Sequence, residues 1–78
     1  MNITFSKQAA KAIGRIDSPL KQRMKTAIEK LPDGDVRKLK GYSTAYRLRV
    51  GDYRILFDMT AESIEITNIL PRGEAYKK

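Results

Sequence analysis

Apolar and polar residues alternate on both sides of Gly51-Asp52, and this pattern predicts a β-hairpin in the middle of the chain. Residues 46–50 read Tyr-Arg-Leu-Arg-Val, and residues 53–57 read Tyr-Arg-Ile-Leu-Phe. A two-residue connection that contains glycine is typical of a tight turn with a positive φ. Because successive side chains of a strand point to opposite faces, one face of this hairpin is expected to be apolar.

The other face of the hairpin collects three arginines, Arg47, Arg49 and Arg54. The expected register sets Arg49 opposite Arg54, and like charges in directly opposed positions destabilise a sheet. One interpretation is the solvated outer face of a basic protein. The other is a phosphate-binding surface, because positions that break a local rule are often functional and guanidinium groups bind phosphate oxygens strongly.

Two amphipathic helices are predicted before the hairpin. Ser6 is a candidate N-cap for the first helix, and Ser18 is one for the second, where Pro19 suits the first helical position. The apolar residues of the second helix recur with helical spacing and share one face: Leu20, Met24, Ala27, Ile28 and Leu31. Pro32 ends this helix.

The remaining pattern predicts an α+β fold in a single domain, residues 1–78. Further strands are expected over residues 1–5, 36–40 and 64–70. A turn over residues 58–63 would bring Phe57 opposite Ile64 and continue the apolar face of the hairpin. The two N-terminal helices are then expected to pack on this face of a small, mostly antiparallel sheet, which leaves the arginines on the open face.

Composition narrows the chemistry. The chain of 78 residues contains neither cysteine nor histidine, so disulfides, thiolate metal sites and a histidine base are excluded, and we expect no metal and no cofactor. Sixteen Lys and Arg against nine Asp and Glu give a net charge of +7, which favours a polyanionic partner such as nucleic acid or an acidic protein. Because no apolar run is long enough for a signal peptide or a membrane span, a cytoplasmic protein is expected.

The C-terminal segment adds two candidate residues, Arg72 and Tyr76. Arg72 follows the last predicted strand and is expected to lie beside Arg54. Tyr76 comes four residues later, close enough in sequence to return over the same face.

These segments together resemble a known family over nearly the whole chain. The segments are Lys38-Leu39-Lys40-Gly41, Tyr46-Arg47-Leu48-Arg49, Gly51-Asp52-Tyr53-Arg54 and the terminal Arg72 with Tyr76. In this order and spacing they resemble the RelE/ParE superfamily of bacterial toxins from type II toxin–antitoxin modules, and its RelE branch more closely. RelE-like toxins are endoribonucleases that enter the ribosomal A site and cut mRNA by attack of a 2′-hydroxyl on the adjacent phosphate.

The resemblance implies a role for each candidate residue. The implied catalytic residues are Arg54, Arg72 and Tyr76, and the implied RNA-binding residues are Lys38, Lys40, Arg47 and Arg49. Arg54 and Arg72 would stabilise charge at the phosphate, while Tyr76 would take the 2′-hydroxyl proton. The implied partners are the 30S A site of the ribosome, mRNA and a cognate acidic antitoxin, without a metal or a cofactor.

Two departures from the family pattern leave alternatives open. Arg47 and Arg49 stand where some members have lysine, and Pro71 stands where many have histidine. Arginine holds its proton throughout the physiological range, so it binds phosphate but is a poor base. The alternatives are a ParE-like inhibitor of DNA gyrase and a catalytically silent homologue that binds an antitoxin or nucleic acid.

Overall fold

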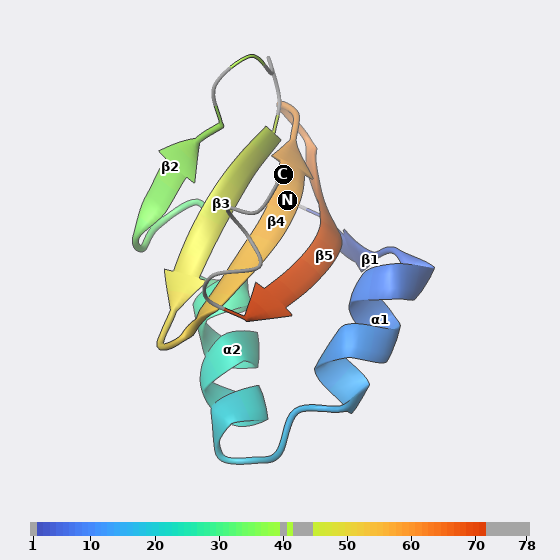
Figure 1. Cartoon of the computed structure of the whole chain (residues 1–78). Coiled ribbons are helices and arrows are strands. Elements are labelled where there is room, and N and C mark those ends of the chain that lie inside the picture. Colours follow the sequence, from blue (N-terminus) through green and yellow to red (C-terminus); the bar gives the residue numbers. More distant parts are fainter. Residues whose placement is uncertain (1, 40, 42–44, 72–78) are drawn as a thin grey trace.

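The computed structural model describes residues 2–39, 41 and 45–71, and it confirms the α+β fold (Figure 1). The elements in chain order are β1 (Asn2–Phe5), α1 (Lys7–Gly14), α2 (Leu20–Glu29), β2 (Val36–Lys38), β3 (Ala45–Val50), β4 (Tyr53–Met59) and β5 (Ser63–Pro71). Neither helix of the described residues is long and apolar enough to cross a membrane.

The five strands form one sheet in the order β1-β5-β4-β3-β2. Only the β1–β5 pair is parallel within the described residues, and the other three pairs are antiparallel. α1 packs against β5 and α2 against β3, so both helices cover the same apolar face. The core side chains come from both helices and from alternate positions of the central strands: Ala9, Ile13, Ile16, Met24, Ile28, Leu31, Leu48, Val50, Ile55, Phe57, Ile64, Ile66 and Ile69.

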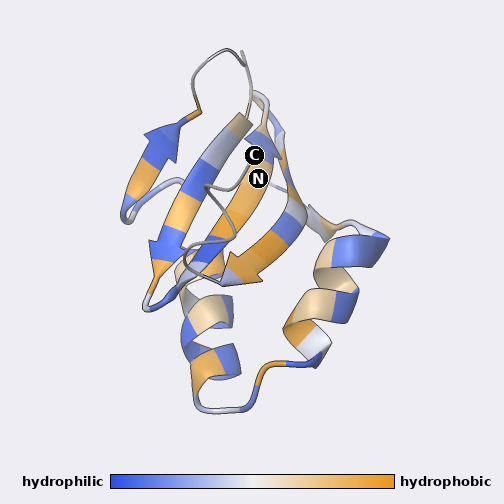
Figure 2. Cartoon of the chain, in the orientation of Figure 1, coloured by the Kyte–Doolittle hydropathy of each residue, from blue (hydrophilic) through white to orange (hydrophobic). Residues whose placement is uncertain are grey.

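The central hairpin has the predicted register. Val50 pairs with Tyr53, and Arg49 with Arg54, across the turn. Gly51 adopts a φ of 57°, a backbone conformation that residues with a Cβ atom rarely adopt. Figure 2 shows the alternation of apolar and polar residues along β3 that determines which face of the hairpin meets the helices.

The expected register between β4 and β5 is wrong by two residues at Phe57 and by three residues at Ile55. Phe57 pairs with Ile66 rather than Ile64, because β4 continues to Met59, which pairs with Ile64. The tighter turn is closed by a hydrogen bond from the Thr60 amide to the Ser63 carbonyl, 2.9 Å long. This longer pairing also brings Met59 against the hydrophobic core.

A β-bulge further along β5 was not predicted either. The register shifts between Leu56 and Phe57, so Thr67 has no partner residue on β4. The Thr67 hydroxyl donates to the Leu56 carbonyl at 3.1 Å, and the Thr67 carbonyl accepts from the Ser6 hydroxyl at 2.8 Å. The bulge therefore has its polar groups satisfied, and it turns Ile69 toward the core.

The two predicted helix caps have different outcomes. The Ser6 hydroxyl accepts a 3.0 Å hydrogen bond from the Ala9 amide, which confirms the N-cap of α1. The Ser18 prediction is wrong, because Pro19 itself occupies the N-cap position of α2 and no side chain caps this helix. Ser18 is one residue too early in the chain to reach the free amides of the first turn.

Candidate nucleic-acid interface

The face of the sheet without helices carries arginines in two rows that run across the strands. One row contains Arg49, Arg54 and Leu70, and the other contains Arg37, Arg47, Leu56 and Asn68. Residues directly opposite one another share a face, and the rows lie two residues apart along β3 and β4, about 6.7 Å. We call Arg37, Arg47, Arg49 and Arg54 the arginine face.

The predicted site residues reach this face unequally. Arg47, Arg49 and Arg54 lie together as expected. Lys38 pairs with Tyr46 and therefore lies on the helix-bearing side of the sheet, where it is exposed, so the structure does not group it with the arginines. Lys40, Arg72 and Tyr76 lie outside the described residues.

Arg37 is the member of the arginine face that the sequence analysis missed. It pairs directly with Arg47 at the edge of the sheet and is exposed. The available signal was the alternation of β2, because half-buried Val36 faces Leu48 in the core and its neighbour must then face the other way.

Arg54 is the one charged side chain that is buried within the described part of the chain, with 4% of its surface exposed. Its Nη1 atom lies 3.5 Å from the carbonyl oxygen of Tyr53, a long hydrogen bond. Its neighbours in the row are exposed Arg49 and half-buried Leu70. A guanidinium group at a buried position interacts more strongly with an anion than one in water does, because the local dielectric constant is lower.

Arg47 has an incomplete set of hydrogen bonds. Its Nη1 atom is buried and has no hydrogen-bond partner among the described residues. An unsatisfied buried donor costs about 1–3 kcal/mol, and more when the group is charged. A phosphate oxygen would supply the missing acceptor if the guanidinium group turned toward solvent.

Negative charge begins one row beyond these arginines. Asp58 lies directly opposite Glu65, in a row that also contains Ala45 and Thr4. The open face is therefore divided into a cationic end near the hairpin turn and an anionic end near the β4–β5 turn. A polyanion is attracted to the first end and repelled from the second.

The side chains of the arginine face are suited to binding negative charge. Within the described ranges, no cluster of three or more His, Cys, Asp or Glu side chains could hold a metal ion. Because arginine does not act as a base in the physiological range, a proton acceptor has to come from a different residue type.

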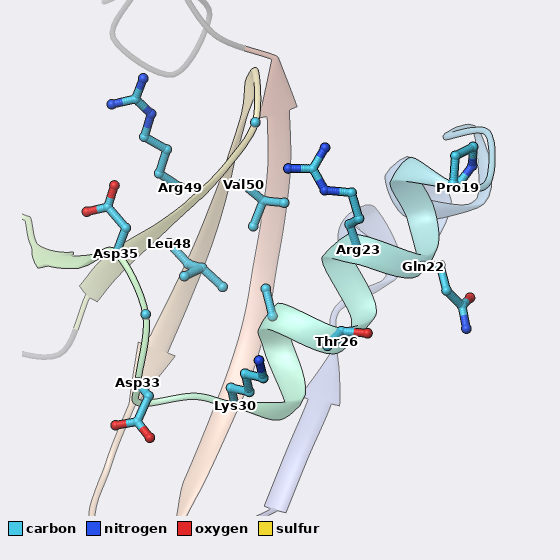
Figure 3. A pocket seen from close by; sticks show the side chains of 13 residues that line it. Pro19, Gln22, Arg23, Thr26, Lys30, Asp33, Asp35, Leu48, Arg49 and Val50 are labelled. Atoms are coloured by element: carbon cyan, nitrogen blue, oxygen red, sulfur yellow. The ribbon is translucent and has the colours of Figure 1, made fainter.

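A groove of about 610 Å³ lies on the other side of β3, between this strand and α2 (Figure 3). Leu48 and Val50 contribute apolar surface. Arg23 on α2 and Lys30 at its C-cap contribute positive charge, and Asp33 and Asp35 contribute negative charge. Arg49 borders the groove, so it belongs to the lining of the groove as well as to the arginine face.

Comparisons with known proteins agree with this architecture. The family model described as "ParE toxin of type II toxin-antitoxin system, parDE" matches residues 3–76. Toxin RelE3 of Methanocaldococcus jannaschii is 30% identical over 84 residues, which covers 97% of this chain and 96% of that protein.

Two solved toxin–antitoxin complexes contain a similar chain. The RelB–RelE complex of Methanococcus jannaschii aligns with a TM-score of 0.80 and 29% identity, over 94% of each chain. The RelE–RelB complex of Pyrococcus horikoshii OT3 aligns with a TM-score of 0.75 and 29% identity, over 92% of this chain and 94% of that one. This chain therefore belongs to the RelE/ParE superfamily of toxins from type II toxin–antitoxin modules.

Proposed function

We propose that this toxin is a ribosome-dependent mRNA endoribonuclease that binds mRNA in the 30S A site across the arginine face. The observation that carries the proposal is the pair of arginine rows, in which buried Arg54 lies beside Arg49 and next to the row of Arg47. Four guanidinium groups on one sheet face are unfavourable for the free protein, and a phosphodiester chain offsets their repulsion. The named relatives at 29–30% identity are RelE proteins, which favours the nuclease branch of the superfamily.

The proposed reaction is an attack of the 2′-oxygen on the adjacent phosphorus. The new P–O2′ bond forms as the P–O5′ bond breaks, and the departing 5′-oxygen takes a proton from water, which leaves a 2′,3′-cyclic phosphate and a free 5′-hydroxyl. Negative charge grows on the non-bridging oxygens in the transition state, and Arg54 stabilises it from a buried position. Arg47 and Arg49 hold the RNA backbone.

Arg72 and Tyr76 complete the proposed site. Pro71, the last residue of β5, pairs with Tyr53, so the chain leaves β5 beside the residue that precedes Arg54. Arg72 would add a second charge at the cleaved phosphate. Tyr76 would accept the 2′-hydroxyl proton, a step that requires its phenolate form.

The decisive experiment is mRNA cleavage by the purified toxin on programmed bacterial ribosomes, with the cut mapped by primer extension. We expect cuts within the A-site codon, and Arg54→Ala should lower the cleavage rate by a factor on the order of 100 to 1000. Lys25→Ala is the control, because Lys25 is exposed on α2, on the helix-bearing side of the sheet, and lines neither pocket of the described residues. Circular dichroism verifies that each variant is folded.

Gyrase poisoning is the second candidate, because the matching family model is described as a ParE toxin. It is tested in parallel by a supercoiling assay with purified gyrase. Intact mRNA together with inhibited gyrase would contradict the nuclease proposal. Cleavage that is equally fast in the wild type and in Arg54→Ala would contradict the role of the arginine face.

The proposed partner in the resting cell is a cognate acidic antitoxin, and the proposed compartment is the cytoplasm, where ribosomes are found. The two RelE structures named above are complexes with RelB. In this chain the groove beside α2 offers apolar Leu48 and Val50, and its three cations, Arg23, Lys30 and Arg49, outnumber its two carboxylates, Asp33 and Asp35. An acidic amphipathic segment fits this combination, and through Arg49 it would reach the arginine face.

A further inference from the structure

Arg37 lies where the family resemblance assigned no role. It is exposed on β2, the edge strand, directly opposite Arg47. Two residues further along β3, Arg49 lies directly opposite Arg54. The open face therefore carries two cross-strand arginine pairs of the same kind, and Arg37 is the one member of these pairs to which the proposed reaction gives no role.

The Arg37–Arg47 pair carries two features that a bound anion would relieve. Like charges in directly opposed positions repel, so this arrangement is unfavourable unless an anion is bound on the open face beside the two guanidinium groups. The buried Nη1 atom of Arg47 also has no hydrogen-bond partner among the described residues. An anion bound by both guanidinium groups would remove the repulsion, and it would satisfy this donor once the Arg47 side chain turns toward solvent.

The spacing of the two pairs fits two successive phosphates of a polymeric anion. The pairs are separated by two residues along a strand, about 6.7 Å, which is comparable to the separation of successive phosphates in an extended RNA strand. The next row in the same direction contains Asp58 and Glu65, which repel phosphate. The face therefore has room for two adjacent phosphates and not for a third in that direction.

We propose that Arg37 and Arg47 bind a second RNA phosphate, adjacent to the phosphate that is cleaved beside Arg54. This inference rests on the proposed function, because it assumes that RNA is the ligand of the arginine face. Arg37 is a positioning residue in this arrangement. It holds the neighbouring phosphate equally in the ground state and in the transition state, and it takes no part in proton transfer.

The test measures binding and cleavage separately on programmed ribosomes. Binding is measured with an mRNA that carries a 2′-deoxynucleotide at the cut position and therefore cannot react. Arg37→Ala is expected to weaken binding and raise KM by about tenfold, with kcat within a factor of two, because a charged contact is lost while the reacting groups remain. Arg37→Lys should restore most of the affinity.

A chemical change in the mRNA identifies the phosphate. A neutral methylphosphonate is placed, one at a time, at the phosphate on either side of the cut. At one of the two positions the methylphosphonate should weaken mRNA binding by the wild-type toxin about as much as Arg37→Ala does. At that position it should not weaken mRNA binding by the Arg37→Ala variant any further. Such non-additivity is not expected if Arg37 only supports the fold.

Lys38→Ala is the matched comparison, because Lys38 is the adjacent cation on β2 and lies on the other face of the sheet. A larger loss for Lys38→Ala than for Arg37→Ala would overturn the inference, and so would full additivity with both methylphosphonates. If the wild type binds the mRNA but never cuts it, the nuclease proposal fails while the binding data still decide the role of Arg37. If the wild type binds no RNA, both proposals fail.

Discussion

Arg54 and Arg47 share the open face of the sheet but differ in how their guanidinium groups are supported. Arg54 is buried and lies near the Tyr53 carbonyl. Arg47 is half-buried, with one nitrogen that has no partner among the described residues. Groups that bind ligand often carry such a cost in the free protein, because the ligand supplies the missing contact.

The cost at Arg47 leads to a prediction in which stability and function change in opposite directions. Arg47→Met removes the unsatisfied donor and the repulsion from Arg37, so the free energy of unfolding should rise by about 1 kcal/mol. In a domain of this size the melting temperature should rise by roughly 4–8 °C, while mRNA cleavage falls. Thermal unfolding and the ribosome assay measure the two effects.

Arg23→Met is the control for stability, because Arg23 is exposed on α2. Its effect should stay within about 0.5 kcal/mol. A clear destabilisation by Arg47→Met would show that the Nη1 atom has a partner in solution.

At the level of elements, Ser6 connects α1 to the β5 bulge. Its hydroxyl caps the helix through the Ala9 amide and donates to the Thr67 carbonyl, while its own amide donates to Ile66. The bulge places Asn68 and Leu70 on the open face beside the arginine rows. A residue at the N-terminus thereby supports the strand that borders the candidate site.

We therefore predict that Ser6→Ala lowers the free energy of unfolding by about 1–2 kcal/mol, the usual cost of losing an N-cap. Ser18→Ala is the matched control, because it makes the same chemical change before α2, where no side chain caps the helix. Ser18→Ala should be almost neutral in the same denaturant titration. Equal losses for the two variants would contradict the cap assignment.

On the scale of the whole molecule, charge opposes stability. A chain of 78 residues without cysteine has a small core, and its stability is expected to be about 4–12 kcal/mol. A net charge of +7 adds self-repulsion, which is concentrated where the arginine pairs meet. An acidic partner or RNA would relieve this repulsion and stabilise the fold by mass action.

Salt should therefore act in opposite directions on the free toxin and on its complex with RNA. When NaCl is raised from about 0.05 M to about 0.3 M, the melting temperature of the free toxin should rise, because repulsion between its charges is screened. Binding to a single-stranded RNA should weaken, with a log–log slope of about −0.7 for each phosphate contact. A melting temperature that falls over the same range would contradict the predicted repulsion.

The local pattern of the chain determined its elements and one face of its site. Alternation around Gly51-Asp52 was sufficient for the β3–β4 register, because a two-residue turn leaves no freedom in the pairing. The same alternation predicts that Arg47, Arg49 and Arg54 share one face. The N-cap of α1 was predictable for the same reason, since a cap depends on residues within one turn.

Tertiary structure decided what depends on partners distant in the sequence. The β4–β5 register and the Thr67 bulge follow from how Met59, Ile64 and Ile69 fill the core. The place of Arg37 depends on β2 pairing with β3. Alternation gives only the period of a strand, and the partner strand decides which row and which neighbours each side chain joins. The hairpin sequence therefore determines three residues of the arginine face, Arg47, Arg49 and Arg54, and the pairing of the edge strand β2 adds Arg37.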